Sequence, residues 1–583
     1  MNEIIIGIDL GTTNSEVAIV EQGKVRIIAD GDKKILPSFV GIDINGELLV
    51  GDSARNQYLA YPERTVKSIK RLMGQNSRID LAGHVYSPQE ISAIILKRLK
   101  TIAEQDLGQT ISKAVITVPA YFSDAQRQAT REAGEIAGLD VVRMINEPTA
   151  AALVYGGQQT EPKRMLVYDL GGGTFDVSVV TIEAGVVEVL ASHGDNHLGG
   201  DDFDQQIINY LLEHLQNTYQ VDARQNSKAM ARISRAAEQA KFLLSEQPFA
   251  QIEEEYLLDQ DGSALHLSVE LSRMAYEDMI EDYINATMDA VHIALKGAKL
   301  TVNDIDDIIL VGGSTRTPCI RERMLAEFGF EPHSEVDPDL CVAMGAAMQA
   351  AMINGQHVDT VLVDVTPYTY GSSAIGTLNG NYYPYMYVPI IHKYSVLPNR
   401  KTEAFMTSYD GQETVEVTIY QGEDADALNN IKIGEFRIEG LQNTAAGNLI
   451  TLTLDLDLNG ILHVSAQEKA TGLQKSITIK NALAQFESSS LDTAKQRITS
   501  LFGQMEAGML EPAPPEMSIA PEIVAAQTLI AKAESLFEQI SNEDQEDMID
   551  LIEVINACID ANDISGLNAP SMQLTDIIYY LES

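Results

Sequence analysis

One pattern occurs twice in this chain: IDLGTTNSEVAIV at residues 8–20 and YDLGGGTFDVSVV at residues 168–180. Each copy has an acidic residue, then a tight turn of small residues, then a run of alternating apolar positions. Each copy also follows a β-rich run, so each predicts a strand, a glycine turn and a second strand. The duplication predicts two similar half-domains that face one cleft.

The residues around the repeat alternate short β-rich runs with longer helical patterns. Examples are KAVITVPA at 113–120, a helical pattern over 123–138 and DDIILVGGSTR at 306–316. This alternation is typical of α/β units. From residue 361 the pattern changes to period-two alternation interrupted by Asp-Gly and Asn-Gly turns, which predicts an antiparallel β domain.

The residues after Ala484 predict helices. The apolar stripe there consists of Ile523, Ala526, Ile530, Ala533, Phe537 and Ile540. This spacing is typical of one packed helix face. Four prolines interrupt the region, because proline cannot donate the helical hydrogen bond; they are Pro512, Pro514, Pro515 and Pro521.

Composition limits the possible partners. The chain has 583 residues, of which 45% are hydrophobic, and its 41 basic and 84 acidic residues give a formal net charge of −43. This acidic excess disfavours nucleic acid and anionic membranes as partners. The three cysteines, Cys319, Cys341 and Cys558, lie far apart and indicate neither a disulfide framework nor a zinc site. We expect a cytoplasmic protein without an export signal or membrane span.

Each turn of the repeat has the composition of a phosphate-binding loop. Residues 11–13 (Gly-Thr-Thr) and 171–174 (Gly-Gly-Gly-Thr) would let backbone N–H groups approach phosphate oxygens. Either turn alone is equally consistent with an ordinary hairpin. The duplicated acids, Asp9 and Asp169, favour the phosphate interpretation, because hydrated Mg²⁺ is usually bound by one or two carboxylates and a phosphate.

Longer motifs resemble the DnaK-type seventy-kilodalton heat-shock chaperones: IDLGTTNS, TVPAYFSDAQRQAT, INEPTAAALVYG, DLGGGTFDVSVV, HLGGDDFD and ILVGGSTR. The resemblance extends along nearly all of residues 3–482. It implies an α/β actin-like ATPase domain of two lobes, then an antiparallel β-sandwich peptide-binding domain and a short α-helical lid. The implied boundaries are 1–357 for the ATPase domain, 358–365 for the interdomain linker, 366–482 for the β-sandwich and 483–583 for the lid.

The resemblance also implies a site for ATP or ADP with Mg²⁺. Asp9 and Asp169 match aspartates that hold the metal ion through water. The residues matched to catalysis are Lys70, Glu147, Asp169 and Thr174. Those matched to the nucleotide are Gly11, Thr12, Thr13, Asn14, Gly171, Gly172, Gly173, Thr174, Glu238, Lys241, Ser245, Gly312, Gly313, Ser314, Arg316 and Asp339. A solvated surface lysine is the alternative for Lys70, and a surface charge stripe is the alternative for the helix that carries Glu238.

The apolar segment TVLVDV at 360–365 resembles a linker that docks on the ATPase domain. Linkers are normally polar and flexible, so an apolar one favours a docking strand. The residues matched to nucleotide relay and to a J-domain co-chaperone are Pro119, Arg127, Arg143, Asn146, Val361, Leu362 and Asp364. An ordinary surface arginine is the alternative for Arg127.

The β domain is expected to bind extended apolar peptides. The residues matched to its pocket are Ala374, Ile375, Leu378, Phe405, Val415, Val417 and Ile450, and simple core packing is the alternative for each of them. The chain departs from the family in four features: Ser372 replaces an aliphatic residue, 380–389 is tyrosine-rich, the segment from Gly74 to Pro88 is short, and the helical tail is short. In the last two features it is similar to the short paralogues of the HscC type.

We therefore expect an ATP-dependent molecular chaperone, an ATPase that binds and releases hydrophobic segments of unfolded proteins. A J-domain co-chaperone and a nucleotide-exchange factor are expected partners. One alternative is a nucleotide-switched module for one dedicated partner. A small-molecule kinase of the same superfamily is a second, although it gives no role to residues 361–482. A filament-forming protein is a third, although the β domain and lid would crowd its stacking.

Overall fold

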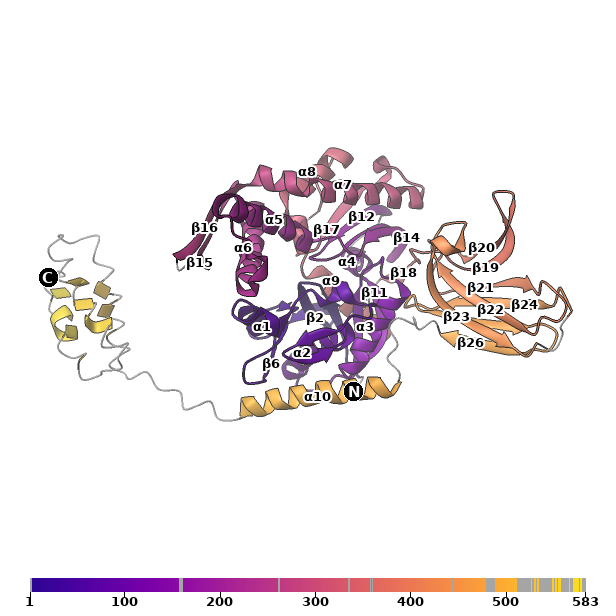
Figure 1. Ribbon diagram of the computed structural model, residues 1–583, viewed down its shortest axis with the longest axis horizontal. Helices are drawn as coiled ribbons and strands as arrows, with labels where there is room; N and C mark the ends of the chain where they lie inside the picture. The colour runs from indigo at the N-terminus through magenta and orange to yellow at the C-terminus, as the bar shows by residue number, and fades with distance from the viewer. Residues whose placement is uncertain are drawn as a thin grey trace. The chain divides into compact units, whose positions relative to one another are not determined.

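The structure is a computed structural model that describes residues 3–156, 161–260, 263–333, 336–356, 358, 360–441, 445–478 and 488–510, with scattered positions between 526 and 578. The chain divides into two compact units, Met1–Phe502 and Gly503–Ser583. Figure 1 shows the strands and helices of the described residues. The first unit contains both copies of the sequence repeat.

The first copy of the repeat lies in a six-stranded sheet. Its strands are β11 (Asp140–Asn146), β10 (Lys113–Val118), β1 (Ile5–Leu10), β2 (Asn14–Glu21) and β3 (Lys24–Ile28) in that order, with β4 (Leu36–Pro37) paired to β2. Strands β1, β2 and β3 pair in antiparallel fashion, whereas β10 and β11 join β1 in parallel. The glycine turn between β1 and β2 is therefore at the carboxyl end of the parallel strands.

The second copy lies in a five-stranded sheet built on the same plan. Its order is β17 (Asp307–Val311), β12 (Lys163–Leu170), β13 (Phe175–Glu183), β14 (Val186–Asp195) and β18 (Val361–Val363). Here β12, β13 and β14 are antiparallel, and β17 pairs with β12 in parallel. The duplicated strand–turn–strand pattern that the sequence predicts is present in both sheets.

Helices α4 (Glu147–Gly156) and α9 (Cys341–Ile353) pack against each other, and α9 also packs on β1. Their small residues allow backbone contact. A Cβ atom on Gly7 of β1 would lie 2.1 Å from the backbone nitrogen of Ala347, and one on Gly345 would lie 1.8 Å from the carbonyl oxygen of Ala150. The alanine-rich sequence of α9 is thus required by the closeness of its neighbours.

The other helices of the first unit surround these two sheets. They are α1 (Asp52–Gln57), α2 (Pro88–Leu107), α3 (Asp124–Ile136), α5 (Gly200–Tyr219), α6 (Ser227–Glu246), α7 (Arg273–Ala298) and α8 (Pro318–Phe328). Helices α2 and α3 begin with capping boxes, in which Ser87 pairs with Glu90 and Ser123 with Gln126. Within the described ranges, no helix has the length and apolar character needed to cross a membrane.

Three small sheets complete this α/β region. Strands β5 (Val40–Ile42), β6 (Leu48–Val50) and β7 (Thr65–Val66) form one, and β8 (Ile79–Leu81) and β9 (His84–Tyr86) form the second. The third is the long hairpin of β15 (Phe249–Gln260) and β16 (Ser263–Ser272). The short hairpin β8–β9 is located in the Gly74–Pro88 segment that the sequence marks as reduced.

The β-rich region consists of two antiparallel four-stranded sheets. One has the order β20 (Asn381–Ile391), β19 (Tyr370–Leu378), β22 (Thr414–Gln421) and β23 (Ile431–Glu439), and the other has β21 (Asn399–Met406), β24 (Leu449–Leu456), β25 (Leu462–Glu468) and β26 (Gln474–Thr478). Residues from both sheets share one apolar core, including Ile419, Phe436, Leu454 and Val464. In Figure 1 the β19–β20 hairpin projects away from the remaining strands.

Helix α10 (Ser488–Leu510) follows the β-rich region. In the second unit, Ala526, Ile530 and Ala533 are helical and buried, as the predicted stripe requires. The other stripe residues and the prolines lie outside the described residues: Ile523, Phe537, Ile540, Pro512, Pro514, Pro515 and Pro521. Parts of the predicted linker, β-sandwich and lid, at 359, 479–482, 483–487 and 511–525, also lie outside them.

We predict that Gly345→Ala lowers the melting temperature of the first unit by about 3 °C. The added methyl group would overlap the Ala150 carbonyl, a backbone group that cannot rotate away, and overpacking of this kind costs roughly 3 kcal/mol. Differential scanning calorimetry measures the effect. Gly503→Ala is the matched control because nothing lies within 4 Å of its added Cβ. Equal melting temperatures for both variants would contradict the described packing of α9 on α4.

Candidate functional site

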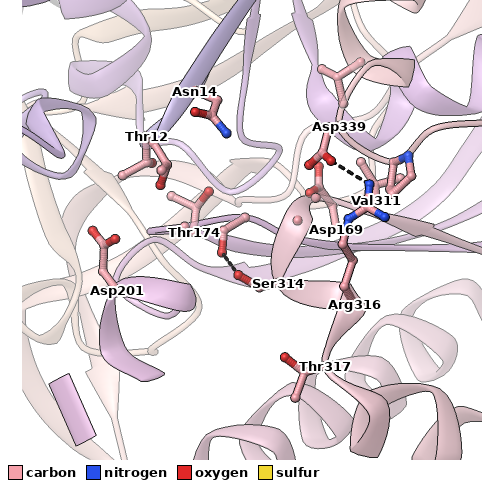
Figure 2. A pocket seen from close by; sticks show the side chains of 18 of the residues that line it. Thr12, Asn14, Asp169, Thr174, Asp201, Val311, Ser314, Arg316, Thr317 and Asp339 are labelled. Atoms are coloured by element: carbon pink, nitrogen blue, oxygen red, sulfur yellow. Dashed lines mark hydrogen bonds and ion pairs between the residues drawn. The ribbon is translucent and has the colours of Figure 1, made fainter. Parts of the chain in front are cut away.

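A cavity of about 610 Å³ opens between the two glycine turns. Its walls come from the β1–β2 turn, the β12–β13 turn, the short 3₁₀ helix at Ile69–Leu72, helix α6 and the 3₁₀ turn at Gly313–Arg316. Figure 2 shows Thr12, Asn14, Thr174 and Asp201 at one part of the cavity and Arg316 with Asp339 at another. The site therefore draws on both copies of the repeat.

The two glycine turns approach each other so closely that side chains are excluded. A Cβ atom on Gly172 would lie 1.9 Å from Oγ1 of Thr13, and one on Gly173 would lie 2.6 Å from Cγ2 of Thr12. The Gly171 N–H donates to the Thr174 carbonyl at 3.0 Å, which closes the second turn. The result is a narrow cradle lined by backbone groups and threonine hydroxyls, the form of site that suits a phosphate chain.

The floor of the cavity carries a buried lysine among acids. Lys70 is 4% exposed and forms an ion pair with Glu147, and Asp169 is 6% exposed. Burial acts to lower the pKa of Lys70, but attraction from Glu147 and Asp9 raises it overall, so the lysine stays charged. Thr117 donates a hydrogen bond to Asp9 at 2.6 Å.

The surrounding acids carry more negative charge than Lys70 can balance. Burial, followed by repulsion from Glu147, raises the pKa of Asp169 well above its usual value. Burial also raises the pKa of Glu147 to about 7, against the attraction of Lys70. Groups with shifted pKa values in a cleft are typical of catalytic sites. Added positive charge would restore the ordinary ionisation of these carboxylates.

Helix α6 supplies another wall, and its face is fixed by spacing. Glu238, Lys241 and Ser245 lie three and four residues apart and all line the cavity. The Lys241 ammonium is held by Asp204 at 2.8 Å and donates to the Gly200 carbonyl at 3.2 Å. These contacts place the lysine at the junction of α5 and α6.

The 3₁₀ turn after β17 forms the next wall. Gly312 has φ of +81°, and a Cβ there would lie 2.4 Å from the Leu170 carbonyl oxygen, so this position requires glycine. Ser314 donates to the Gly171 carbonyl at 2.9 Å, which ties this turn to the phosphate cradle. Arg316 donates to Asp339 at 2.7 Å. Figure 2 marks this contact with a dashed line.

The structure gathers nearly every residue that the sequence assigned to the nucleotide. Gly173 is the exception, because it does not line the cavity but contacts Thr12 behind it. Sequence reasoning missed several lining residues: Glu16, Asp201, Phe242, Glu246, Val311, Thr317, Pro338 and Val342. A signal existed for Asp201, which belongs to the motif HLGGDDFD, and for Phe242, which directly follows Lys241.

Three of the residues assigned to relay, Arg127, Asn146 and Asp364, form a second, buried group. Arg127 donates to the side chain of Asn146 at 2.6 Å, and Asn146 donates to Asp364 at 2.9 Å. Since Asn146 precedes Glu147, this chain of hydrogen bonds connects the cavity floor with the segment after β18. Pro119 accepts from the Phe122 N–H at 3.2 Å, and Arg143 is half-buried on β11.

Val361 and Leu362 extend the second sheet. They pair in parallel with Val186 and Val187 of β14. The turn between β24 and β25 also contacts the first sheet, because the Met144 N–H donates to the Asn459 side chain at 2.9 Å. Arg127 donates to the backbone carbonyl of the same asparagine at 3.4 Å. The β-rich region is thus attached to the α/β region through β18 and through this turn.

The residues assigned to the peptide pocket divide into two groups. Val417 and Ile450 are buried in the core of the two β-sheets, and Phe405 and Val415 pack against that core. The others lie on β19, where Ile375 is 51% exposed; this second group is Ala374, Ile375 and Leu378. The first group lies on strands β21, β22 and β24. The second group lies on the β19–β20 hairpin.

Strand β19 pairs with strand β22 along only part of its length. Both strands are described in full, and β19 pairs with β22 from Tyr370 to Ser372 only. At that point Ser372 donates its hydroxyl to the Thr418 carbonyl at 2.8 Å. Beyond Ser372, the facing edges of β19 and β22 are not paired with each other.

A family model described as "Hsp70 protein" matches residues 5–556. The chain belongs to the Hsp70 family. It is 46% identical over 485 residues to the "Chaperone protein DnaK" of Thermosipho melanesiensis, covering 82% of this chain and 80% of the relative, and it has the same identity and coverage with the protein of that name from Thermosipho africanus. The resemblance inferred from the motifs is confirmed, and Hsp70 proteins are nucleotide-binding ATPases.

We predict that Lys70→Ala reduces single-turnover ATP hydrolysis by at least ~100-fold while leaving ATP affinity largely intact. Removing one group that stabilises developing charge typically costs this much in rate. Rapid-quench measurement of one turnover, beside equilibrium binding of ATP, tests this. Lys67→Ala is the control because Lys67 is exposed and does not line the cavity. A normal rate in the Lys70 variant would exclude this lysine from the mechanism.

Proposed function

We propose that the chain hydrolyses ATP in the cavity between the two glycine turns and uses the cycle to bind and release extended hydrophobic segments of unfolded proteins. The chain is an ATP-dependent molecular chaperone of the Hsp70 family and an ATPase. The observation that supports the proposed mechanism best is the hydrogen-bonded chain from Arg127 through Asn146 to Asp364. It connects the proposed hydrolytic centre to the proposed linker.

We divide the chain accordingly into an actin-like ATPase domain of two lobes at 1–357, a linker at 358–365, a β-sandwich at 366–482 and a helical lid at 483–583. The duplicated sheets support the first assignment, and the shared core of two antiparallel sheets supports the third. Helix α10 supports the last, since it begins just after the lid boundary.

The residues present fit a nucleotide phosphate chain with Mg²⁺. Space for the phosphates exists in the cavity that Thr13 and Gly172 both line. A divalent cation would offset the mutual repulsion of the acids around Lys70. Asp9 and Asp169 would hold this cation through water. Among the described residues no three His, Cys, Asp or Glu side chains converge as direct ligands, which agrees with a hydrated ion. Mg²⁺ supplies charge neutralisation at the phosphate oxygens.

Each catalytic side chain then has a defined task. Hydrolysis breaks the bond between the γ-phosphorus and its bridging oxygen, and the attacking water loses a proton. Lys70, which stays charged, stabilises negative charge on the transferring oxygens. Glu147 orients the water and accepts its proton, a task suited to a pKa of about 7. Thr174 donates its hydroxyl at the γ-phosphate.

The nucleotide state reaches the linker through Asn146. Because Asn146 and Glu147 are adjacent, a change in Glu147 alters the position of the Asn146 amide that holds Asp364. Asp364 precedes Val365, which is buried with α4 and α9. Nucleotide can shift the peptide equilibrium only by its differential affinity for the two states, and the coupling is reciprocal.

The peptide site is proposed at the open edges of β19 and β22. Backbone groups there can pair with an extended chain, and the apolar residues from Ala374 to Leu378 and at Val415 and Phe405 would contact its side chains. A J-domain co-chaperone would contact the surface near Arg143, Asn146 and Asp364, and a nucleotide-exchange factor is a further proposed partner. We place the protein in the cytoplasm.

The function is tested by the dissociation rate of a fluorescent apolar peptide, measured with ADP and then with ATP. We predict faster release with ATP in the wild-type chain and no difference between nucleotides in the double variant Val361→Asp, Leu362→Asp. Charges on these residues would oppose pairing of β18 with β14. The control is Val361→Ile, Leu362→Val, which keeps apolar β-formers. Continued coupling in the aspartate variant would exclude β18 as the relay.

We predict that Val415→Phe weakens peptide binding about tenfold without changing the basal ATPase rate. The larger ring would fill space beside the open edge of β22, and overpacking of this kind costs ~1–3 kcal/mol. Fluorescence anisotropy with ADP measures the affinity. Thr414→Phe adds the same ring on the opposite face of the strand and is the control. Undiminished affinity in the Val415 variant would locate the pocket elsewhere.

A further inference from the structure

A second cavity, of about 310 Å³, lies beside the first sheet. Its walls come from strands β2, β3, β4 and β6, from the loop before β4, from the start of helix α1 and from helix α2. Among the described residues, it shares no lining residue with the nucleotide cavity. The buried apolar side chains that line it are Val17, Ile28, Leu36, Val50, Leu99 and Ile102. Since an apolar cavity of about 150 Å³ holds benzene, this one has room for an apolar body of roughly eight carbon atoms.

The charged side chains that line this cavity carry a surplus of positive charge. Arg98 forms an ion pair with Asp30 at 2.6 Å, and Lys33 forms one with Asp52, also at 2.6 Å. Lys34 is exposed, and no described side chain forms an ion pair or hydrogen bond with its ammonium group. The chain as a whole has a formal net charge of −43, so this local surplus runs against its composition.

An apolar interior with one unpaired ammonium at its edge is complementary to a small carboxylate with an apolar body. Both acids that line the cavity are already paired, so Lys34 leaves a single positive charge to neutralise. This favours one carboxylate over a dianion and disfavours a cation. Because an exposed ion pair contributes little free energy, the apolar body supplies most of the affinity and the carboxylate fixes the orientation.

The segment that lines this cavity also supports the first glycine turn. Leu36 of β4 pairs with Ser15 of β2. Two residues after Leu36, the Ser38 N–H donates to the Thr13 carbonyl at 2.8 Å and the Ser38 hydroxyl donates to the Gly11 carbonyl at 2.9 Å. A molecule packed on Leu36 would restrict β4 and stabilise both hydrogen bonds. A turn that is already ordered loses less conformational entropy when a nucleotide binds.

We propose that the second cavity binds a small carboxylate with an apolar body, and that its occupancy strengthens nucleotide binding through β4. The coupling rests on the proposed nucleotide function, whereas binding of the carboxylate does not. Lys34 pairs with the carboxylate, and the apolar side chains between the sheet and α2 enclose the body. Coupling between sites is reciprocal, so the nucleotide strengthens carboxylate binding by the same factor.

The first test uses octanoate as the probe and acetate as the probe that lacks the apolar body. Calorimetry on the full chain measures both Kd values. We expect octanoate to bind at least about a hundredfold more tightly than acetate, because its buried methylene groups supply most of the affinity. Equal affinities for the two probes, or no binding of octanoate, would overturn the proposal.

Lys34→Glu tests where octanoate binds. The matched control is Lys24→Glu, which changes the charge by the same amount at an exposed lysine that does not line the cavity. We expect Lys34→Glu to weaken octanoate about fivefold and Lys24→Glu to bind it as the wild type does. Octanol, which has no charge, should bind all three proteins equally. Octanoate bound in the proposed peptide pocket would ignore Lys34→Glu, and that result, or equal losses in both variants, would overturn the site.

The coupling is measured as the Kd of ADP with and without saturating octanoate, and as the Kd of octanoate with and without ADP. We expect both to tighten by the same factor of about five. In Ser38→Ala, which lacks the hydroxyl that holds Gly11, this factor should fall toward one while octanoate binds as in the wild type.

The outcomes separate the inference from the function on which its second half rests. An ADP affinity that ignores octanoate would overturn the coupling, and unchanged coupling in Ser38→Ala would overturn β4 as its route. Wild-type protein that fails to bind ADP would overturn the nucleotide function and the coupling with it. The octanoate measurements would still decide the cavity, because they need no nucleotide.

Discussion

The absence of a side chain at Gly172 is the constraint on which the functional site depends. Its Cα lies so near the Thr13 hydroxyl that a single methyl group would collide with it at 1.9 Å. Since Thr13 belongs to the first sheet and Gly172 to the second, the contact sets how closely the two sheets approach at the cavity. Gly312, in the turn after β17, has the same requirement, because an added Cβ would collide with the Leu170 carbonyl. The missing side chains at Gly172 and Gly312 therefore determine the dimensions of the cradle.

Within this cradle the acidic side chains outnumber the basic ones. Lys70 is buried with more carboxylates than it can neutralise, and burial raises the pKa of both Glu147 and Asp169. Such an arrangement costs folding free energy, because each buried charge loses its hydration. It becomes favourable when a polyphosphate with its cation redistributes the charge. Binding of the ligand therefore relieves the unfavourable electrostatics of the buried acids, and this relief contributes to the affinity.

Much of the site could be predicted from sequence because its chemistry is local. The turns at 11–13 and 171–174 carry their glycines and hydroxyls in short contiguous motifs, and the spacing of Glu238, Lys241 and Ser245 fixes a helix face. Phe242 escaped prediction because an exposed phenylalanine in a helix differs from a core residue only by its surroundings. The contact of Asn459 with Met144 was equally inaccessible, since it joins a hairpin turn to a strand more than three hundred residues earlier.

Ser372 also illustrates the limit of sequence reasoning. From the sequence it could be identified only as a replacement of an aliphatic residue, whereas in the structure its hydroxyl donates to the Thr418 carbonyl. The hydrogen bond satisfies a buried group and marks where the β19–β22 ladder ends. The exposed β19–β20 hairpin beyond it depends on this three-dimensional arrangement, which no periodicity reveals.

Arg127 holds two attachments at once: the Asn146 amide that carries Asp364, and the Asn459 carbonyl of the β24–β25 turn. Once either is made, the other partner is confined to its neighbourhood at a high effective concentration. The arginine is itself held in place, because it also donates to the Phe122 and Ala120 carbonyls. The two hydrogen bonds that share this guanidinium therefore reinforce each other in attaching the β-rich region to the α/β region.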